Sequence, residues 1–297
     1  MSSLPGAPDT LEQALQDAVR CLTAAGVPSP RVDAELLAAH LLKVSPGRLR
    51  ALVLTGSAAP DGLGDLVEER ARRTPLQHLT GIAYFRHVEL AVGPGVFIPR
   101  PETESVAQLV IDHALTLDAP KIVDLGTGSG AIAASVADEV PGADVYAVEL
   151  SDLAVAWAEG NLRPHGVTLV QGDLADALAE HDATFDVVVS NPPYIPSAAV
   201  PNEPEVALHD PEMALYGGGG DGMELPAAAA ASAGRLLKPG GYFVMEHAEV
   251  QAGAVASLLG RAGCWLSITT HRDLTGRDRA TSAVLTSPAP SEARRTP

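Results

Sequence analysis

The sequence predicts an α/β protein that begins with a small helical domain and continues as a doubly wound, mostly parallel sheet of seven strands. Two observations predict the sheet. From Lys121 onward, short apolar segments alternate with helical ones, which is typical of strands joined by crossover helices. Several of these apolar segments end in a polar residue, as strands do where a parallel sheet binds its ligand. The residues before Gly81 show helical spacing of apolar side chains instead.

The composition fits an enzyme that acts on a small molecule or on a basic protein partner. The chain has 297 residues, of which 46% are hydrophobic, enough for one large or two ordinary domains. Its net charge of −17 argues against direct nucleic-acid binding, because such binding relies on Lys and Arg. The 4% of aromatic residues offer little surface for stacking bases.

The cysteines and histidines predict no metal site. Cys21, Cys264 and the nine histidines lack metal-ligand spacing, and two lone cysteines fit a reducing compartment. We see no secretory signal and no run of eighteen apolar residues. We therefore expect a cytoplasmic protein without a membrane partner.

The predicted helical domain covers residues 1–81. Thr10, followed three residues later by Gln, has the pattern of a capping box at a first helix. A second helix is expected to begin at Pro30 and to bury Val32 and Leu37. Shorter helices are expected near 46–54 and 61–73. Since this domain carries no catalytic pattern, we predict that it binds a partner protein.

The segment 82–100 is expected to link the two domains, with a β-hairpin over 82–92. Pro101 suits the first turn of a helix, and the acids at 102 and 104 suit its positive end. Arg100 and these acids could equally close over the pocket of the sheet. We place the catalytic domain at 101–286 and predict a disordered tail at 287–297.

A glycine-rich loop, Gly126 to Gly130, follows the first strand of this domain. Glycines allow a tight turn and let a ligand approach bare amides at a helix N-terminus. The same residues also fit the dinucleotide pattern G-x-G-x-x-A, which leaves a nicotinamide enzyme possible at this point.

Polar residues also follow the next two strands. Glu149 ends the second strand, at about the spacing where such folds place an acid on a ribose diol. Asp173 and Leu174 follow the third strand, where they could border an adenine. With Asn191 after the fourth strand, these strand ends predict a nucleotide-type ligand.

The stretch Asn191 to Tyr194 suits the activation of a planar NH₂ group toward an electrophile. The lone pair of such a nitrogen is delocalised and poorly nucleophilic. The Asn191 side-chain oxygen and the Pro192 carbonyl could accept its two N–H groups and turn the lone pair toward an electrophile. Pro192 and Pro193 stiffen the backbone, and Tyr194 offers a stacking face. The same four residues could also form an ordinary proline-rich turn.

The remaining residues complete the predicted sheet. The Gly- and Pro-rich segment 195–222 reads either as a flexible surface loop or as a substrate lid. Strands are expected at 242–246, 265–270 and 281–286, which brings the total to seven.

Taken together, these motifs resemble the bacterial peptide-chain release factor glutamine N5-methyltransferases, class I enzymes that use S-adenosylmethionine. The resemblance extends over nearly the whole chain. It rests on Thr80–Gly81 with Phe85, residues 98–104, 124–133, Asn191 to Tyr194, Tyr216 to Gly218 with Asp221–Gly222, and residues 276–279.

The resemblance implies a class I methyltransferase-like fold and methyl transfer to the side-chain amide nitrogen of the GGQ-motif glutamine in release factors. The products would be N5-methylglutamine and S-adenosylhomocysteine. The helical domain would hold the release factor, and we expect a monomer.

The resemblance also implies roles for individual residues. Glu149 would hold the cofactor ribose, and Asn191 would be the catalytic residue and also adjoin the cofactor. Asp173 and Leu174 would flank the adenine. The methionine part would be lined by Gly126, Thr127, Gly128, Ser129 and Gly130, and the substrate glutamine would be held by Asn191, Pro192, Pro193 and Tyr194. Two residues depart from the family pattern, which usually has Asp at 149 and Gly at 248.

Other functions remain open from the sequence. A ribosomal-protein glutamine methyltransferase would need the same pocket, and an adenine-N6 DNA methyltransferase would use the same tetrapeptide, although the net charge counts against DNA. A dehydrogenase would leave Asn191 to Tyr194 without a role. A non-catalytic adaptor would be expected to have lost one of the motifs, and none is lost.

Overall fold

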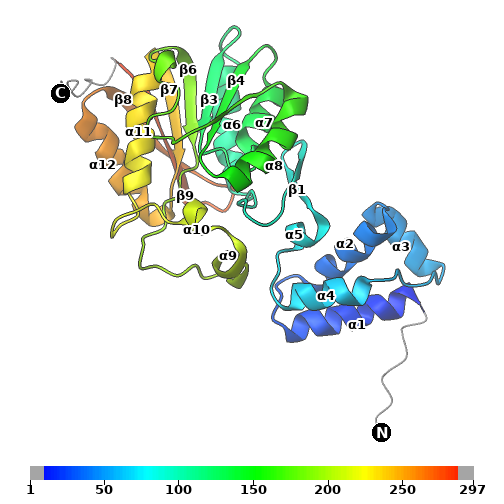
Figure 1. The fold of residues 1–297 in the computed structure, drawn as a ribbon. Coiled ribbons are helices and arrows are strands. Elements are labelled where there is room, and N and C mark those ends of the chain that lie inside the picture. The colour runs from blue at the N-terminus through cyan, green and yellow to red at the C-terminus, as the bar shows by residue number, and fades with distance from the viewer. Residues whose placement is uncertain (1–9, 287–297) are drawn as a thin grey trace. The chain divides into compact units, whose positions relative to one another are not determined.

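The computed structural model describes residues 10–286, so the predicted tail at 287–297 lies outside the described residues. The chain forms two compact units (Figure 1). Unit 1 contains the residues up to Ile82 together with 201–209, and unit 2 contains 83–200 and the residues from Asp210 onward. Over 10–286, no helix combines the length and apolar character needed to cross a membrane.

Unit 1 is built from short helices around one apolar core. At the start of the first helix, the Thr10 hydroxyl accepts a hydrogen bond from the Gln13 backbone N–H at 3.3 Å. The helices are α1 (Leu11–Ala24), α2 (Pro30–Leu42), α3 (Pro46–Leu54), α4 (Leu63–Ala71) and α5 (Leu76–Thr80). Their core includes Leu11, Leu15, Leu22, Leu37, Leu49 and Val67.

The second helix buries a different face from the one expected. Leu37 is fully buried as predicted, but the prediction for Val32 is wrong, since its side chain is 55% exposed. The neighbouring Asp33 is buried instead, and its carboxylate accepts a hydrogen bond from Arg70 at 2.8 Å. Successive residues on a helix point about 100° apart, so burying this ion pair turns Val32 toward solvent.

A segment far along the chain joins unit 1. Residues 201–209, which include α9 (Pro204–His209), belong to this unit although they lie between two stretches of unit 2. Glu205 makes ion pairs with Arg70 at 2.8 Å and with Arg73 at 2.6 Å. We call Asp33, Arg70, Arg73 and Glu205 the strap cluster. The chain therefore passes from unit 2 to unit 1 and back between Tyr194 and Tyr216.

Unit 2 contains the predicted seven-stranded sheet, in the order β5-β4-β3-β6-β7-β9-β8. The strands from β5 across to β7 run parallel, and β9 runs antiparallel to both β7 and β8. The predicted fold class is confirmed. The strands are β3 (Lys121–Leu125), β4 (Asp144–Glu149), β5 (Thr168–Gln171), β6 (Phe185–Ser190), β7 (Leu237–Glu246), β8 (Trp265–Arg272) and β9 (Asp278–Leu285).

The strand order reverses between β3 and β6, which is where open α/β sheets bind ligands. The register pairs Leu125 with Ser190 and Ser190 with Met245. The residues that follow these three strands therefore lie along one edge of the sheet.

Helices cover both faces of the sheet (Figure 1). One apolar cluster joins it to α6 (Thr103–Ala114), α7 (Ala131–Glu139) and α8 (Asp152–Leu162). The other joins it to α11 (Glu224–Leu236) and α12 (Ala252–Ala262). The shorter elements are α10 (Glu212–Leu215), η1 (Arg163–His165), η2 (Ala179–His181) and η3 (Glu249–Gln251).

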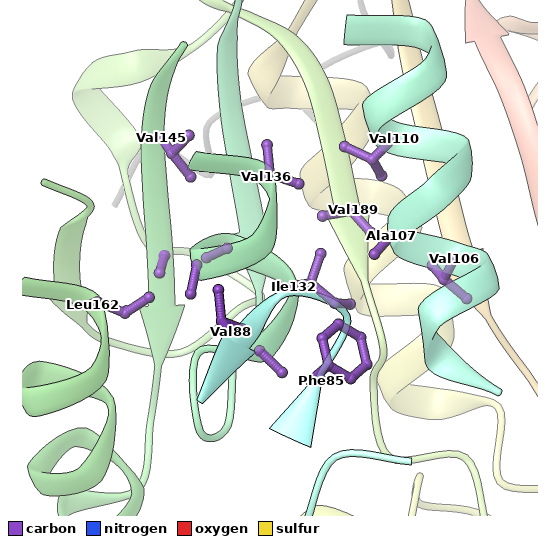
Figure 2. Packing of buried hydrophobic residues seen from close by; sticks show 14 of the residues in the cluster. Phe85, Val88, Val106, Ala107, Val110, Ile132, Val136, Val145, Leu162 and Val189 are labelled. Carbon is purple, nitrogen blue, oxygen red and sulfur yellow. The ribbon is translucent and has the colours of Figure 1, made fainter. Parts of the chain in front are cut away.

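The predicted hairpin is a separate two-stranded sheet, formed by β1 (Ile82–Phe85) and β2 (Val88–Ala91). Figure 2 shows Phe85 and Val88 of the hairpin near Ile132 of α7, and all three belong to the first apolar cluster. Burying these side chains fixes the hairpin to the helices next to the glycine-rich loop.

Candidate active site

The glycine-rich loop turns directly after β3. The backbone N–H groups of Gly126 and Thr127 both donate to the Val148 carbonyl at 2.9 Å. Gly130 has φ +88°, and an added Cβ there would lie 2.8 Å from the Leu162 side chain. Gly128 has φ +59°, and an added Cβ would meet nothing within 4 Å. Gly130 thus permits close packing, whereas Gly128 faces open space where a ligand can approach the backbone.

Glu149 holds this loop from the end of β4. One carboxylate oxygen accepts from the Gly128 N–H at 2.8 Å, and the other accepts from the Ser151 N–H at 2.9 Å. Burial raises the pKa of Glu149, while these backbone hydrogen bonds oppose the rise. The longer side chain at this position therefore still reaches the loop, and its oxygens keep lone pairs for a ligand hydroxyl.

Asp124 is a second buried carboxylate beneath the loop, and the sequence analysis did not single it out. It is 2% exposed and accepts a hydrogen bond from the Thr127 hydroxyl at 2.6 Å. Burial raises its pKa to about 7, and the charge of Glu149 adds to the rise. A positively charged ligand at this loop would favour the charged forms of both acids.

Asp173 and Leu174, the second and third residues after β5, lie in different environments. Leu174 is buried, and its side chain is 3.7 Å from where a Cβ on Gly126 would stand. Asp173 is exposed, and its side chain accepts from the Ala175 N–H at 2.9 Å. The structure therefore brings Leu174 to the glycine-rich loop and leaves Asp173 at the start of the following turn.

Asn191 emerges from β6 at the same edge. The preceding Ser190 is buried and donates its hydroxyl to the Leu125 carbonyl at 2.7 Å, which ties β6 to β3. The half-buried Asn191 donates its side-chain N–H to the Thr103 hydroxyl at 3.4 Å. Pro192 is buried, and Pro193 and Tyr194 are half-buried. The tetrapeptide thus begins one strand away from the glycine-rich loop.

Tyr194 lies against a buried glutamate that the sequence analysis missed. Its hydroxyl donates to Glu246 Oε1 at 3.3 Å, and burial raises the pKa of the tyrosine. Burial also raises the pKa of Glu246 to about 7, whereas a hydrogen bond from Thr103 and the charge of Arg279 favour its charged form. Glu246 Oε2 is buried and has no hydrogen-bond partner of normal geometry.

We call Thr103, Asn191, Tyr194 and Glu246 the pocket cluster. Glu246 ends β7, which pairs with β6. The rule that pointed to Asn191, a polar residue where a parallel strand ends, would also have found Glu246.

The segment after Tyr194 is anchored at both ends. A Cβ on Gly217 would lie 2.6 Å from the Pro193 carbonyl oxygen, and one on Gly222 would lie 2.2 Å from the Tyr194 carbonyl oxygen. Gln251 Nε2 donates to the carbonyls of Tyr194 and Asp221 at 2.8 and 2.9 Å. Only glycine allows this close approach. Gly217 and Gly222 therefore pack directly against the backbone of the tetrapeptide.

Two other positions of interest are also accounted for. Arg100 does not stay free at the pocket, since its side chain pairs with Asp210 at 2.5 Å. Ala248, where the resembled family usually has Gly, has φ −65°, a value that any residue adopts.

Comparison with known proteins identifies the family. The description "Methyltransferase small domain" matches residues 87–206, and "PrmC N-terminal domain" matches residues 13–81. A release factor glutamine methyltransferase of Streptomyces coelicolor is 47% identical over 274 residues, 90% of this chain and 95% of the relative. The chain belongs to the release factor glutamine methyltransferase family. The resemblance inferred from the motifs is confirmed, and the protein is a methyltransferase whose cofactor is S-adenosylmethionine.

Two further relatives show the range of the similarity. The release factor glutamine methyltransferase of Mycobacterium tuberculosis is 43% identical over 281 residues, 93% of this chain and 91% of the relative. A 4-amino-L-phenylalanine/4-methylamino-L-phenylalanine methyltransferase of Streptomyces pristinaespiralis is 39% identical over 269 residues, 88% of this chain and 91% of the relative.

The buried acids fit this cofactor. S-adenosylmethionine carries a sulfonium and an ammonium group beside one carboxylate. The glycine-rich loop has two buried carboxylates, Asp124 and Glu149, whose pKa values burial raises. A net positive ligand would supply the charge that these two acids lack nearby.

Proposed function

We propose that the protein methylates the side-chain amide nitrogen of the GGQ-motif glutamine in peptide-chain release factors, with S-adenosylmethionine as donor. The products are N5-methylglutamine and S-adenosylhomocysteine. The observation that carries this proposal is the identity of 47% to a release factor glutamine methyltransferase across nearly the full length of both chains.

The pocket chemistry supports the proposal. The Asn191 oxygen and the Pro192 carbonyl accept the two N–H groups of the substrate amide and direct its lone pair out of conjugation. S-adenosylmethionine, when bound, supplies an electrophilic methyl group on its sulfonium. The product amide keeps one of its two hydrogens, and the other leaves the nitrogen as a proton that is released to solvent. The residues therefore align the reactants rather than supply an acid.

The cofactor contacts are proposed residue by residue. Gly126, Thr127, Gly128, Ser129 and Gly130 line the methionine part. Glu149 binds the ribose, and Asp173 and Leu174 flank the adenine. The support is geometric, because Glu149 already meets the loop at Gly128, and Leu174 packs close to Gly126.

We also propose a division of labour along the chain. Residues 1–81 hold the release factor, 82–100 link, and 101–286 carry out methyl transfer. In residues 10–82 the buried Asp33 and Arg70 pair with each other, while Leu54 is 88% exposed and available to a partner. The domain thus offers apolar surface to a partner protein.

The assembly and cellular location complete the proposal. We propose a monomer that works in the cytoplasm without nucleic acid or membrane. Cys21 and Cys264 are both free, which fits a reducing compartment. Light scattering of the purified protein tests the monomer, and a dimer would contradict it.

One relative gives a second candidate substrate. The similarity to the Streptomyces pristinaespiralis enzyme also extends over most of both chains. An aromatic amine has the same planar NH₂ group, so the two acceptors at 191 and 192 would suit it too. The lower identity, 39% against 47%, places this candidate second.

The test is to offer tritiated S-adenosylmethionine with one acceptor at a time: release factor, ribosomal protein, 4-amino-L-phenylalanine or duplex DNA. We expect label in the release factor, at the glutamine of the GGQ motif by mass spectrometry. Asn191→Ala serves as the inactive control. Label in another acceptor and none in the release factor would contradict the proposal.

A further inference from the structure

The reaction proposed above requires the Asn191 side chain to be held in one orientation. Its amide group can face the substrate with either its oxygen or its nitrogen. With its oxygen toward the substrate, it accepts a hydrogen bond from the glutamine NH₂ group. With its nitrogen toward the substrate, two N–H groups face each other and neither finds an acceptor. Something in the protein must therefore select the first orientation.

The structure has a candidate for this selection in Thr103, the first residue of α6. Its side chain is 4% exposed, and its oxygen accepts the Asn191 side-chain N–H at 3.4 Å. A threonine hydroxyl can donate one hydrogen and accept others. It favours the correct asparagine orientation only if its own hydrogen points elsewhere.

Glu246 provides the acceptor for that hydrogen. Glu246 is 2% exposed, its buried Oε2 has no hydrogen-bond partner of normal geometry, and a hydrogen bond from Thr103 favours its charged form. An ionised carboxylate only accepts hydrogen bonds, so beside it the Thr103 hydrogen points to Glu246 and the Thr103 lone pairs face Asn191. The Tyr194 hydroxyl also donates to Glu246, at 3.3 Å.

We propose that Thr103 and the ionised Glu246 orient the Asn191 amide, so that its oxygen faces the substrate glutamine. Both are positioning residues, since neither touches the reacting nitrogen. This inference rests on the proposed function.

The charge of Glu246 depends on its neighbours. Arg279 of β9 and the hydroxyls of Thr103 and Tyr194 favour the ionised form, and Glu102 opposes it. Burial dominates and raises the pKa of Glu246 to about 7. When Glu246 gains a proton, it can donate to Thr103, the Thr103 hydrogen can turn toward Asn191, and the amide orientation is no longer selected.

The test compares four variants as full-length proteins, with kcat and KM for the methylated acceptor measured at saturating S-adenosylmethionine from about pH 6 to about pH 8, on either side of the raised pKa. Glu246→Gln removes the charge, Thr103→Val removes the hydroxyl, and Thr103→Ser keeps it. Glu249→Gln is the matched control, because Glu249 is exposed three residues away. Calorimetry measures S-adenosylmethionine affinity, and thermal unfolding checks that each variant folds.

We expect Glu246→Gln and Thr103→Val to lower kcat about 10- to 100-fold, the effect of losing a hydrogen bond to a charged group. Cofactor affinity should stay unchanged, and Thr103→Ser should restore most of the rate. The wild type and Glu249→Gln should gain activity as the pH rises through about 7, the value for Glu246, whereas Glu246→Gln should lose this dependence. A purely structural role would not produce the restoration by serine or the flat profile.

The orienting role is wrong if Thr103→Val keeps the wild-type rate, or if Glu246→Gln keeps both the rate and the pH profile. A wild-type enzyme that methylates another acceptor but no release factor would contradict the proposed function instead. The variants would then be compared on that acceptor, since any planar NH₂ group needs the same asparagine orientation.

Discussion

The strap cluster of unit 1 and the pocket cluster of unit 2 each contain a glutamate, half-buried in the first and fully buried in the second, and their neighbours affect its charge in opposite ways. In the strap cluster, Glu205 pairs with Arg70 and Arg73 at 2.8 and 2.6 Å. In the pocket cluster, the Tyr194 hydroxyl donates to Glu246, while Arg279, whose charge favours ionised Glu246, donates its hydrogen bond to Asp273 at 3.2 Å. The pKa of Glu205 is lowered, because the arginine hydrogen bonds outweigh burial, while the pKa of Glu246 is raised to about 7.

This difference distinguishes a cluster that stabilises the fold from a cluster that serves the reaction. A buried carboxylate matched by guanidinium groups stays charged over the physiological pH range and fixes the segments that carry it. A buried carboxylate without a close counter-charge costs stability, and such groups gather at functional sites. We therefore assign the strap cluster to holding 201–209 on unit 1 and the pocket cluster to the chemistry.

The largest expected effect is on stability in the strap cluster. Arg70→Ala leaves the buried Asp33 without its partner and leaves Glu205 with Arg73 alone, so we expect the free energy of unfolding to fall by about 3–5 kcal/mol. Denaturant unfolding measures the loss. Arg72→Ala is the matched control, since the Arg72 side chain is 63% exposed in its ion pairs and should cost less than about 1 kcal/mol. Equal losses of unfolding free energy in Arg70→Ala and Arg72→Ala would contradict the stabilising role assigned to the strap cluster.

The next effect is on the rate in the pocket cluster. Asn191→Ala should lower methyl transfer by about 10²–10³, the usual cost of one positioned polar group, with cofactor affinity nearly unchanged. Asn191→Asp should also fail, because it places an added charge in the site. Asn202→Ala, at an exposed asparagine, should keep the wild-type rate. Near-normal turnover by Asn191→Ala would show that the tetrapeptide has another role.

Glu149 should affect binding rather than the chemical step. Glu149→Gln removes a charged acceptor from the Gly128 N–H and from the proposed contact with the cofactor ribose. We expect S-adenosylmethionine to bind roughly tenfold or more weakly, as for a hydrogen bond to a charged group. Calorimetry that finds the same affinity would exclude Glu149 from the ribose.

Asp124 should make cofactor binding depend on pH. Its pKa is raised to about 7, and a cationic ligand favours the charged form, so binding below this pH must displace a proton. Affinity should therefore rise as the pH increases through about 7, and Asp124→Asn should bind more weakly without this dependence. Calorimetry near pH 6 and pH 8, roughly one unit on either side of that pKa, measures both. If the affinity of Asp124→Asn for S-adenosylmethionine kept the same pH dependence, a group other than Asp124 would be responsible for that dependence.

Much of the fold could be predicted from the sequence because local patterns determine it. The glycine-rich loop, the strand ends at Glu149 and Asn191, and the change from helical to alternating segments are all features of short stretches. The closely packed Gly217 and Gly222 could be noticed in the sequence, but not what they pack against. That contact depends on the Pro193 and Tyr194 carbonyls.

The rest depends on residues far apart in the chain. Thr103, Asn191 and Glu246 come from three elements that only the sheet order brings together. Glu205 looks like an ordinary acid of a polar segment, and nothing near it in the sequence indicates Arg70. Val32 fits an apolar helix face, and only the buried pair of Asp33 with Arg70 explains why it is exposed.

The most direct test of the contrast is the same substitution at both glutamates. The ordinary pKa is 4.5, so the raised value of Glu246 means that its stabilising contribution is present below about pH 4.5 and is lost as the pH rises through about 7. For Glu205, with a lowered pKa, the contribution is present above 4.5 and is lost as the pH falls through the lower folded value.

Thermal unfolding near pH 8, about one unit above the folded pKa of Glu246, therefore compares Glu246→Gln with Glu205→Gln. The account predicts opposite signs, each on the order of 1 kcal/mol: Glu246→Gln more stable than the wild type but slower in methyl transfer, and Glu205→Gln less stable. If both variants are destabilised to the same extent, the two clusters do not differ in the way described here, and Glu246 is a structural residue.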